Sequence, residues 1–356
     1  MRIIHVLHSH GYGGAESHAL MMMKGQQAAG HDVFFAGPLD SWIGHACAEA
    51  GIEALHIGMH GMLDLVSHWK LMRLARQWRA DIVHGHLIRG AMYAGIAGHL
   101  DRRPVAICTA HATTAKTHMH RCAHIIAVSD AVRTNLIAAG YAADRISMIH
   151  NGVPDAQSSI SSEDRARLRA ELGIPAEITA VVNAGRFVFD KGQDLLVEAL
   201  AQTPPEMHLY LIGDPDTEFG AQVKALPHAA GRIHFLGYRP DVQRILPAFD
   251  MYVLSSRREA LSLSLVEAFA ARLPVVATTV GGVPEIVLHE RTGLQVRPND
   301  PSALGQAMVR LHANPDLAQQ LATDGRHFFE QHLTADSMLK KTLSVYERAL
   351  SATRHR

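Results

Sequence analysis

The sequence predicts an α/β protein built from two doubly wound, parallel-sheet domains. Two observations favour this fold class. The chain has 356 residues, which is too long for one compact core, so two domains are expected. Short apolar segments of strand type alternate with segments of helix type, and this alternation restarts after a polar stretch in the middle of the chain. Such alternation is typical of parallel strands that are joined by crossover helices.

The first series spans residues 1–157, the expected N-terminal domain. It begins with a buried strand at residues 2–8 and a glycine-rich turn, GYGGAE, and continues with a helix from about Ser17 to Ala29. The segments that follow are HDVFFAG, LHIG, LDLVSHWKLMRLARQW, DIVHGH, a helix from about Gly90, VAICTAH, HIIAVS and a helix from about Asp130. The Asn-Gly and Pro of RISMIHNGVP favour a turn that leads out of this domain.

The second series spans residues 158–334. A linker is expected around Ser158–Ser162, followed by a helix at Ser162–Leu172 with Ser162 near its N-cap. The segments that follow are AVVNAGR, a helix around Asp194–Ala201, HLYLIG, RIHFLG, MYVLS, a helix around Leu263–Ala271, PVVAT and a helix from about Val283. Residues 335–356 contain a last helix, roughly Ala335–Ser351. Two such domains would face each other, with ligand at the carboxyl ends of their strands.

The composition excludes several classes of protein. The 34 basic residues balance the 34 acidic ones, so no excess of positive charge indicates nucleic acid as a partner. Three cysteines without a C-x-x-C spacing favour a reducing cytosol over a disulfide framework. No apolar run approaches the roughly 18–20 residues of a membrane span. The first apolar run is interrupted by His5, too early for the core of a signal peptide.

The motif GRFVFDKG at residues 185–192 brings two cations to the end of a predicted strand. Arg186 ends the strand, and Lys191 follows five residues later. Arginine can bind two phosphate oxygens at once and lysine supplies a point charge, so the pair suits a diphosphate. A solvated loop with incidental charges is the alternative on this motif alone.

Two glutamates eight residues apart, Glu259 and Glu267, flank a segment that contains serines. A helix that begins at about Ser262–Ser264 would offer free backbone N–H groups and a partial positive charge to an anion. Glu267 would lie about one turn into that helix. Carboxylates accept hydrogen bonds from sugar hydroxyls, so one glutamate could hold a hexose and the other a ribose. On spacing alone, Glu267 could equally be an ordinary helix carboxylate.

Two further regions contain residues suited to tight turns beside a ligand. In TTVGGVPEIV, Gly281 and Gly282 allow close backbone approach or a positive φ, and Glu285 is expected to complement a helix N-terminus. Gly213 and the pair Tyr238–Arg239 each follow a strand, where a flat base could lie against the backbone. Simple turns are the alternative for both.

Together these motifs resemble the retaining glycosyltransferases of family 4, whose GT-B architecture has two Rossmann-like domains. The resemblance covers nearly the whole chain. Its specific feature is the order and spacing of four motifs: GGAE at 13–16, GRFVFDKG at 185–192, E-x7-E at 259–267 and GGVPE at 281–285. The family usually has glycine after the first glutamate, where this chain has Ala260.

The resemblance implies which residues of the C-terminal domain bind a nucleotide-sugar donor. Arg186 and Lys191 would hold the diphosphate, Glu259 would contact hydroxyls of the sugar, and Glu267 would bind the ribose. The backbone N–H groups that would reach the sugar and phosphates belong to Leu261, Ser262, Leu263 and Ser264. Base contacts would come from Gly213, Tyr238 and Arg239, although the family's G-x-G appears here as Gly-Asp-Pro.

The resemblance also assigns residues of the N-terminal domain. Gly14 would let its loop meet the phosphates when the cleft closes, and His111 would stand beside the transferred sugar. Asn151–Gly152 would form the crossover between the domains, and the helix at 335–351 would pack back on the N-terminal domain. Catalysis would then rest on His111 together with Arg186, Lys191 and Glu259.

Histidine is unusually frequent in the first half, where residues 1–150 hold 17 of the 25 histidines. His84 and His86 form an H-x-H pair at a strand end, and such a pair can bind a metal. No third and fourth ligand stands out at a fitting spacing, so no metal is expected. His5, His8 and His10 are interpreted as core or cleft-lining histidines.

One predicted helix of the first half, HWKLMRLARQWRA, combines basic and aromatic side chains. These residues are Lys70, Arg73, Arg76 and Arg79, with Trp69 and Trp78. Such a face could rest on an anionic membrane surface. The favoured alternative is a helix that packs on the sheet with a solvated basic face, because three-residue spacing drifts around a helix.

The predicted function is that of a retaining, metal-independent glycosyltransferase without a cofactor. It would move a sugar from a nucleotide diphosphate sugar, most simply a UDP-sugar, to a glycan or lipid-linked acceptor in lipopolysaccharide or other cell-envelope polysaccharide synthesis. It would be cytoplasmic, with peripheral contact at the inner face of the cytoplasmic membrane as an option. The alternatives are a catalytically silent nucleotide-sugar-binding protein and a dinucleotide-dependent oxidoreductase or epimerase. The absence of a proper G-x-G-x-x-G disfavours the last of these.

Overall fold

The computed structural model divides the chain into two compact units. Unit 1 consists of Met1–Gly152 together with Ala335–Arg356, and unit 2 is Val153–Thr334. The structure describes residues 1–101, 103–114, 117–155, 160–227 and 231–354. Two serines of the expected linker, Ser158 and Ser159, therefore lie outside the described residues.

Unit 1 is built on a seven-stranded parallel sheet with the order β3-β2-β1-β4-β5-β6-β7. The strands are β1 (Arg2–Val6), β2 (Asp32–Gly37), β3 (Glu53–His56), β4 (Ile82–His86), β5 (Val105–Ala110), β6 (His124–Ala127) and β7 (Ile146–Met148). Every residue of the central strands β4 and β5 is buried. Burial on both faces is what near-continuous apolar runs of parallel strands require.

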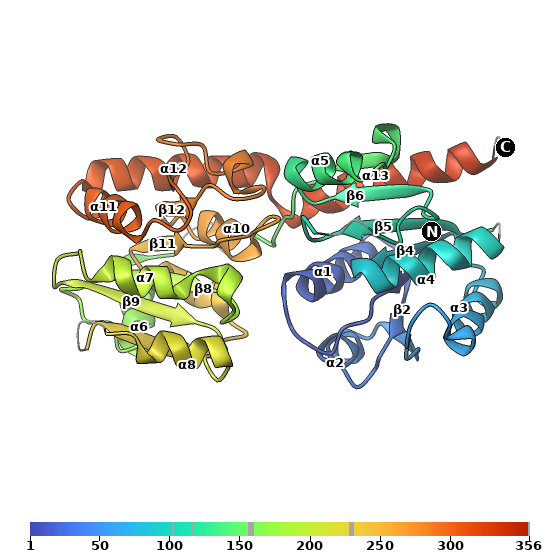
Figure 1. Cartoon of the computed structure of the whole chain (residues 1–356), viewed down its shortest axis with the longest axis horizontal. Helices are drawn as coiled ribbons and strands as arrows, with labels where there is room; N and C mark the ends of the chain where they lie inside the picture. Colours follow the sequence, from blue (N-terminus) through green and yellow to red (C-terminus); the bar gives the residue numbers. More distant parts are fainter. Residues whose placement is uncertain (102, 115–116, 156–159, 228–230, 355–356) are drawn as a thin grey trace. The chain divides into compact units, whose positions relative to one another are not determined.

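Helices cover both faces of this sheet (Figure 1). They are α1 (Gly14–Ala28), α2 (Trp42–Glu49), α3 (Leu65–Gln77), α4 (Leu87–Leu100), α5 (Asp130–Ala138) and α13 (Ala335–Arg354), with a 3-10 turn η1 (Ala143–Arg145). The last helix, α13, belongs to unit 1 although it follows unit 2 in the sequence. It packs Met338, Val345 and Tyr346 into the same apolar cluster as Ile3 and Ile107 of the sheet.

Unit 2 contains a six-stranded parallel sheet with the order β10-β9-β8-β11-β12-β13. The strands are β8 (Thr179–Ala184), β9 (Met207–Ile212), β10 (Ile233–Gly237), β11 (Met251–Leu254), β12 (Val275–Thr278) and β13 (Leu294–Val296). The two parallel-sheet, Rossmann-like domains confirm the fold class that the alternating pattern predicts.

The helices of unit 2 are α6 (Ser162–Glu171), α7 (Gln193–Leu200), α8 (Glu218–Ala225), α9 (Val242–Ile245), α10 (Leu263–Ala270), α11 (Pro301–His312) and α12 (Pro315–His332), with 3-10 turns η2 (Phe189–Lys191), η3 (Leu246–Ala248) and η4 (Val283–Glu285). Three of them, α6, α7 and α10, form where the sequence predicts them, the helix expected from Val283 does not, and the others were not predicted. The helix expected from Val283 is wrong, because only the single turn η4 forms there. Ile286, with φ −119° and ψ −32°, is the C-cap residue of this turn, and Thr292 Oγ1 accepts from the N–H of Leu288. Glu285 is therefore the last residue of a 3-10 turn and does not lie in the first turn of an α-helix.

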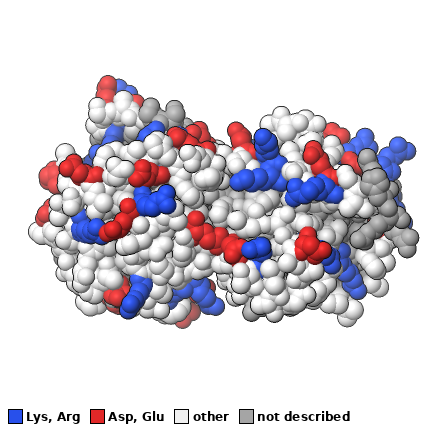
Figure 2. Space-filling model, turned by 90° about the horizontal axis from the view of Figure 1, so that it is seen from above, with Lys and Arg blue, Asp and Glu red and all other residues white. Residues whose placement is uncertain are grey.

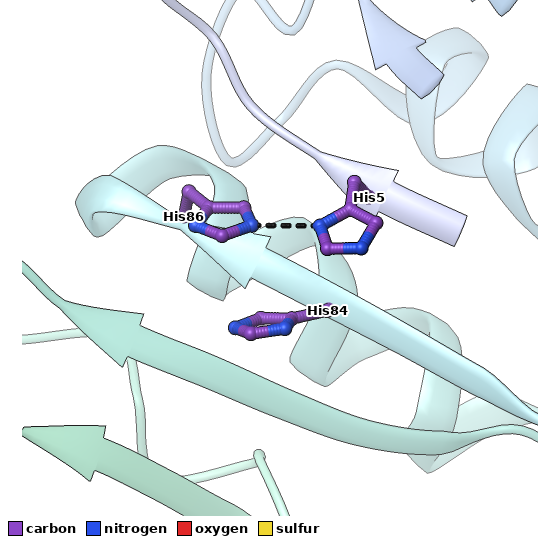
Figure 3. A group of neighbouring side chains, drawn as sticks. All are labelled: His5, His84 and His86. Carbon is purple, nitrogen blue, oxygen red and sulfur yellow. Dashed lines mark hydrogen bonds between the residues drawn. The ribbon is translucent and has the colours of Figure 1, made fainter. Parts of the chain in front are cut away.

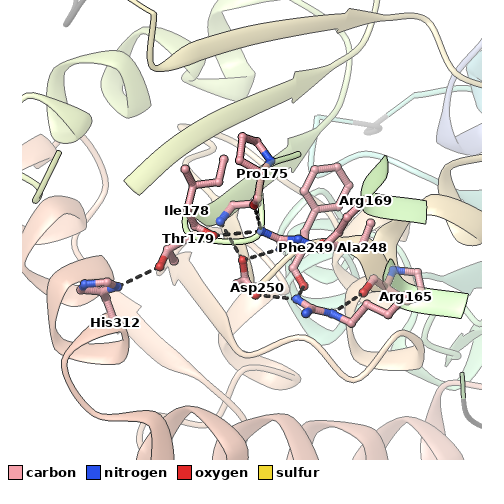
Figure 4. Close-up of polar contacts among 11 residues, drawn as sticks. Arg165, Arg169, Pro175, Ile178, Thr179, Ala248, Phe249, Asp250 and His312 are labelled. Carbon is pink, nitrogen blue, oxygen red and sulfur yellow. Dashed lines mark hydrogen bonds and ion pairs between the residues drawn. The ribbon is translucent and has the colours of Figure 1, made fainter. Parts of the chain in front are cut away.

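A partly buried ionic network anchors α6 at the amino end of the unit 2 sheet (Figure 4). The Asp250 carboxylate accepts from Arg169 Nη1 at 2.9 Å and from Arg165 Nη2 at 2.5 Å. It also accepts from the backbone N–H of Ala180, at the start of β8, at 2.8 Å. The Arg169 guanidinium, only 9% exposed, donates further to the carbonyls of Pro175, Ile178 and Ala248. This network lies at the end of the strands opposite to the predicted site.

Among the described helices, none is long and apolar enough to cross a membrane. Figure 2 shows that acidic and basic side chains are interspersed on the face drawn, without one continuous basic stripe. This distribution agrees with the balanced charge of the sequence.

The Asp250 network predicts a local loss of stability. Asp250→Ala leaves the buried Arg169 guanidinium without its carboxylate and should cost about 3 kcal/mol of unfolding free energy in unit 2. Urea unfolding followed by far-ultraviolet circular dichroism measures this loss. All three tryptophans (Trp42, Trp69 and Trp78) lie in unit 1, so their fluorescence should report an unchanged unit 1 transition.

The matched control is Arg167→Ala. This side chain pairs with Glu163 on the surface of α6, where both partners are at least 70% exposed, so its loss should cost less than about 0.5 kcal/mol. A cost for Asp250→Ala no larger than that of the control would show that the network does not stabilise the unit.

Candidate active site

Unit 2 has one point at which the strand order reverses. The chain runs outward from β8 through β9 to β10 on one side, and then returns to place β11, β12 and β13 on the other. In doubly wound sheets, ligands bind in the crevice outside the carboxyl ends of the two strands at such a switch point. Gly185 and Arg186 directly follow β8, and the loop that carries Glu259 follows β11. The topology therefore brings together motifs that lie about 70 residues apart in the sequence.

An ion pair joins the two motifs. Lys191 Nζ donates to Glu259 Oε2 at 2.5 Å, and the two side chains are only 21% and 11% exposed. Ser256 Oγ donates to the same carboxylate oxygen at 3.4 Å. An ammonium group has three N–H donors, so the Lys191–Glu259 pair leaves donors of Lys191 for an anion beside it.

The backbone on either side of this pair is tightly constrained. A Cβ atom on Gly281, which has a φ of 51°, would lie 1.6 Å from the carbonyl oxygen of Glu259, so only glycine fits there. The N–H of Gly282 donates to the carbonyl of Ala260 at 3.0 Å. The GGVPE motif therefore packs against the backbone of the loop that carries Glu259.

The N-terminus of α10 faces the same switch point. Ser262 is its N-cap residue, and Ser262 Oγ accepts from the N–H of Leu265 at 3.3 Å. Ser264 Oγ donates to the carbonyl of Ala184, the last residue of β8, at 2.8 Å, and also contacts Tyr252 Oη at 2.7 Å. These contacts fix the first turn of α10 against the ends of β8 and β11, with the first backbone N–H groups of the helix lacking intrahelical partners.

Glu267 lies in the second turn of α10. Desolvation by the surrounding protein raises the pKa of its carboxyl to about 7, and a hydrogen bond from Gln243 Nε2 at 3.2 Å opposes this rise. The raised pKa shows that no nearby positive charge, among the residues that the structure describes, compensates for the burial of this carboxylate. Two hydroxyl groups of a ligand could stabilise its charged form by donating hydrogen bonds to it.

The remaining residues predicted in unit 2 differ in their availability. The Arg186 side chain is exposed, and no described residue pairs with its guanidinium. Gly213, with a φ of 147°, approaches so closely that a Cβ would lie 2.1 Å from the carbonyl oxygen of Gly185. Tyr238 is 46% exposed just after β10. The guanidinium of Arg239, by contrast, makes a bidentate ion pair with Asp241, with both bonds at 2.8 Å. Two of its N–H groups are therefore already used.

Unit 1 has its own switch point, between β1 and β4. Gly14 begins α1 just beyond β1, and His86 ends β4 and caps α4. His111 follows β5 directly, and its Nε2 lies 3.2 Å from His86 Nδ1. Gly14 and His111 thus belong to unit 1, whereas the cationic and acidic residues of the predicted site belong to unit 2.

The structure places further histidines beside the H-x-H pair, which spacing in the sequence does not reveal. His5 lies beside His84 and His86 (Figure 3), and His18 lies beside His86 and His111, so that each triple has ligand atoms within 4.8 Å of one another. The rings of His84 and His86 are stacked at 4.4 Å with an interplanar angle of 17°. Stacked rings direct their nitrogens side by side, and the nitrogens of His5, His84 and His86 already have hydrogen-bond partners. This geometry suits a hydrogen-bonded cluster better than a tetrahedral metal site.

Comparison with known families decides the assignment. Residues 12–157 match the family model described as Glycosyltransferase Family 4, and residues 179–314 match the one described as Glycosyl transferases group 1. The two models cover both units in the order found in GT-B enzymes. The chain belongs to glycosyltransferase family 4. This result confirms the resemblance seen in the sequence motifs and replaces the dinucleotide oxidoreductase alternative.

Relatives of this glycosyltransferase support the same assignment over most of its length. It is 26% identical over 352 residues to a D-inositol 3-phosphate glycosyltransferase of Streptomyces coelicolor, with 91% of this chain and 74% of the relative covered. It is 33% identical over 158 residues to the lipopolysaccharide core biosynthesis glycosyltransferase LpsE of Rhizobium meliloti, with 44% and 46% covered. HepE of Anabaena, solved in complex with UDP and glucose, has the same GT-B fold with a TM-score of 0.87, at 22% identity over 98% of this chain and 99% of that one.

The buried histidines of this glycosyltransferase predict that unit 1 loses stability in acid. Burial lowers the pKa of His5 and of His18 from 6.5 to about 4, so both stay neutral in the fold. Between pH 6.5 and 4 the unfolded chain binds protons that the folded chain does not. Stability is therefore complete above pH 6.5 and should fall by about 1.4 kcal/mol per pH unit for each such histidine below it.

Urea titrations followed by tryptophan fluorescence at pH 7.5, 6 and 5 measure this loss in unit 1. His18→Gln should flatten the dependence on pH by about one proton, whereas His99→Gln, at an exposed position, should keep the slope of the wild type. Equal stability of unit 1 at pH 7.5 and 5 would contradict the burial of neutral histidines.

Proposed function

We propose that this glycosyltransferase transfers a sugar from a UDP-sugar, with retention at the anomeric carbon, to a glycan or lipid-linked acceptor in cell-envelope polysaccharide synthesis such as that of lipopolysaccharide. The observation that carries the proposal is the cluster of Arg186, Lys191 and Glu259 with the N-terminus of α10 at one switch point. A site with two cations, a helix N-terminus and a carboxylate suits a diphosphate that is joined to a sugar.

Each part of a donor then has a partner. The free guanidinium of Arg186, the remaining donors of Lys191 and the N–H groups of residues 261–264 would hold the diphosphate. Glu259 would accept from hydroxyls of the sugar, and its bond to Lys191 holds the carboxylate in place. Glu267 would accept from the ribose hydroxyls. The base would lie near Gly213 and Tyr238, and Arg239 would shape that region while bound to Asp241.

The hard step of the reaction is departure of the diphosphate. As the bond between the anomeric carbon and the phosphate oxygen breaks, the acceptor oxygen bonds to that carbon from the same face, and the departing phosphate oxygen takes the acceptor's proton. Arg186, Lys191 and the α10 N-terminus stabilise the charge that develops, so no metal ion is required. Gly14 and His111 would meet the phosphates and the sugar from unit 1.

Relatives support the choice of donor and acceptor. HepE was solved with UDP and glucose, and LpsE of Rhizobium meliloti acts in lipopolysaccharide core biosynthesis. A catalytically silent nucleotide-sugar-binding protein is the competing function. Release of UDP that depends on an acceptor separates the two, because a silent protein binds the donor without turnover.

A surface of unit 1 supports contact with the inner face of the cytoplasmic membrane. The apolar surface Met62, Leu63, Leu65, Val66 and Trp69 forms the start of α3 and the loop before it, and its side chains are 53–89% exposed. Clusters of exposed apolar side chains are rare on soluble monomers and mark interaction sites. Lys70 and Arg73 follow on the same outward stripe of the helix, and the Arg73 guanidinium lies 5.2 Å from the centre of the Trp69 ring. An apolar tip with cations behind it suits a bilayer that carries anionic headgroups.

This surface is held outward by rigid contacts. Asp64 caps α3 by accepting from the N–H of Ser67 at 3.0 Å and from that of His60 at 2.9 Å. Tyr93 Oη donates to the carbonyl of Gly61 at 2.7 Å, and the His68 ring stacks on the Tyr93 ring at 4.0 Å. The loop therefore cannot turn its apolar side chains into the core without breaking these bonds.

Removal of either cation should slow transfer. Arg186→Ala and Lys191→Ala should each lower kcat by ~10²–10³, because both charges act most strongly as the diphosphate departs. The control is Arg258→Ala, which removes an exposed arginine that pairs with Asp190 on the neighbouring loop. A steady-state assay of UDP release measures all three. Turnover of both site variants within a few-fold of the control would rule out the proposed diphosphate site.

Transfer should survive chelation. Lys191, Arg186 and the α10 N-terminus supply the positive charge that a divalent metal gives to the diphosphate in other enzymes, so excess EDTA should leave kcat within about twofold. The measurement compares initial rates before and after EDTA treatment. An activity that EDTA abolishes and Mg²⁺ or Mn²⁺ restores would contradict metal independence.

The apolar surface should bind anionic bilayers. The full chain should sediment with phosphatidylglycerol vesicles and much less with phosphatidylcholine vesicles, and the double variant Leu63→Glu/Leu65→Glu should lower the affinity at least about tenfold. Leu100→Glu, at an isolated exposed leucine of the same unit, is the control. The membrane contact is wrong if the Leu63→Glu/Leu65→Glu variant binds vesicles as tightly as the Leu100→Glu control. It is also wrong if the wild type binds neither kind of vesicle.

A further inference from the structure

A chain of polar side chains leads from His111 into the core of unit 1. His111 Nε2 lies 3.2 Å from His86 Nδ1, and His86 Nε2 lies 2.8 Å from His5 Nδ1, the bond drawn in Figure 3. His5 Nε2 lies 2.7 Å from Gln26 Oε1. The side chains of His86, His5 and Gln26 are completely buried, so water does not compete for these bonds.

The chemistry of imidazole determines which nitrogen donates and which accepts at each step of this series of hydrogen bonds. A neutral imidazole has one N–H donor and one bare nitrogen that accepts. Because Gln26 Oε1 can only accept, the proton of His5 lies on Nε2 and its Nδ1 is bare. His86 must then donate from Nε2 and accept at Nδ1. By the same logic, His111 donates from Nε2, and its Nδ1 carries the lone pair.

A side branch continues from the Gln26 amide to Tyr346, His84 and Thr109. Gln26 Nε2 donates to Tyr346 Oη at 3.3 Å, and Tyr346 Oη in turn bonds to His84 Nδ1. His84 Nε2 then bonds to Thr109 Oγ1 at 2.7 Å. Tyr346 belongs to α13, so the last helix of the protein also contacts Gln26.

Burial keeps the histidines of this hydrogen-bonded series neutral. Burial lowers the pKa of His86 and of His111 well below 6.5, and the neighbouring histidines lower both further. With Gln26 Oε1 facing His5 Nε2, neutral histidines have one arrangement of protons in which every bond from His111 to Gln26 is made. Reversal of the His111 tautomer would leave at least one pair of facing N–H groups or of facing lone pairs, which is costly in a buried site.

We propose that Gln26 is a positioning residue that acts through His5 and His86 to hold His111 as a neutral acceptor, with the bare Nδ1 available to a hydroxyl of the donor sugar. The contact with the sugar rests on the proposed function, whereas the tautomer does not. Gln26, His5 and His86 would thus determine which nitrogen of His111 faces the donor sugar. In other enzymes, too, a catalytic histidine that is held in the wrong tautomer loses activity.

The direct test is nuclear magnetic resonance of the full chain labelled with ¹⁵N-histidine at pH 7.5, without any substrate. The bare nitrogen of a neutral ring resonates far downfield of the protonated one, and His111→Gln identifies the His111 signals by removing them. The expected result is Nε2–H with a bare Nδ1 on His111. Finding Nδ1–H on His111 in the wild type overturns the proposal, whatever the variants do.

Variants then test whether Gln26 sets this state. Gln26→Met removes the acceptor and should move His111 to the Nδ1–H form, with kcat for transfer lowered at least about tenfold and UDP affinity unchanged. Gln26→Glu keeps an acceptor oxygen and should keep the wild-type tautomer. Thr109→Val is the matched control, because Thr109 is equally buried and its hydroxyl bonds to His84 on the side branch.

The outcomes separate this proposal from the proposed function. If Gln26→Met keeps the wild-type tautomer, or lowers kcat no more than Thr109→Val does, Gln26 is not the positioning residue. If the tautomers behave as expected but the wild type transfers no sugar, the chain of hydrogen bonds stands and the assigned reaction falls.

Discussion

The reversal of strand order in each parallel sheet is the constraint on which the rest of this molecule depends. Both sheets are covered by helices on their faces, so the edge that remains for a ligand is the row of carboxyl ends, and the reversal opens it at β1/β4 and at β8/β11. In unit 2 this constraint gathers Arg186, Lys191, Glu259 and the α10 N-terminus from separate loops. In unit 1 it gathers His86 and His111 beside the start of α1.

Local packing turns this gathering into defined geometry. The Lys191–Glu259 pair is bonded at 2.5 Å, and Gly281 leaves room for the Glu259 carbonyl where any side chain would collide. Ser264 fastens the first turn of α10 to the end of β8. These contacts come from three motifs of the second half, which explains why their order and spacing, and not any one of them, identify the family. A preorganised arrangement of charges is what stabilises a leaving diphosphate without reorganisation during the reaction.

Sequence periodicity predicts the two sheets and the placement of the site motifs, because alternation of strands and helices determines which loops meet at a switch point. It does not predict contacts that depend on long-range packing. His5 completes a triple with His84 and His86 only because β1 and β4 are neighbours, and Gln26 and Tyr346 reach the same core from α1 and α13. Arg239 is engaged by Asp241, and the helix expected from Val283 is one 3-10 turn, because backbone and side-chain bonds there outweigh local propensity. A helical pattern alone also could not show that the start of α3 carries its apolar side chains outward.

The two units have chemically different interiors at their switch points: charged groups in unit 2 and neutral histidines in unit 1. The central claim is that unit 2 holds the nucleotide and that His111 touches only the sugar. Titration calorimetry of the full chain with UDP tests it most directly, with Glu267→Gln and His111→Gln as paired variants. UDP should bind the wild type and the His111 variant equally well. It should bind the Glu267 variant at least about tenfold more weakly, because that variant would lose the carboxylate proposed to accept from the ribose hydroxyls. If His111→Gln loses UDP as severely as Glu267→Gln does, the division of the donor between the two units is wrong.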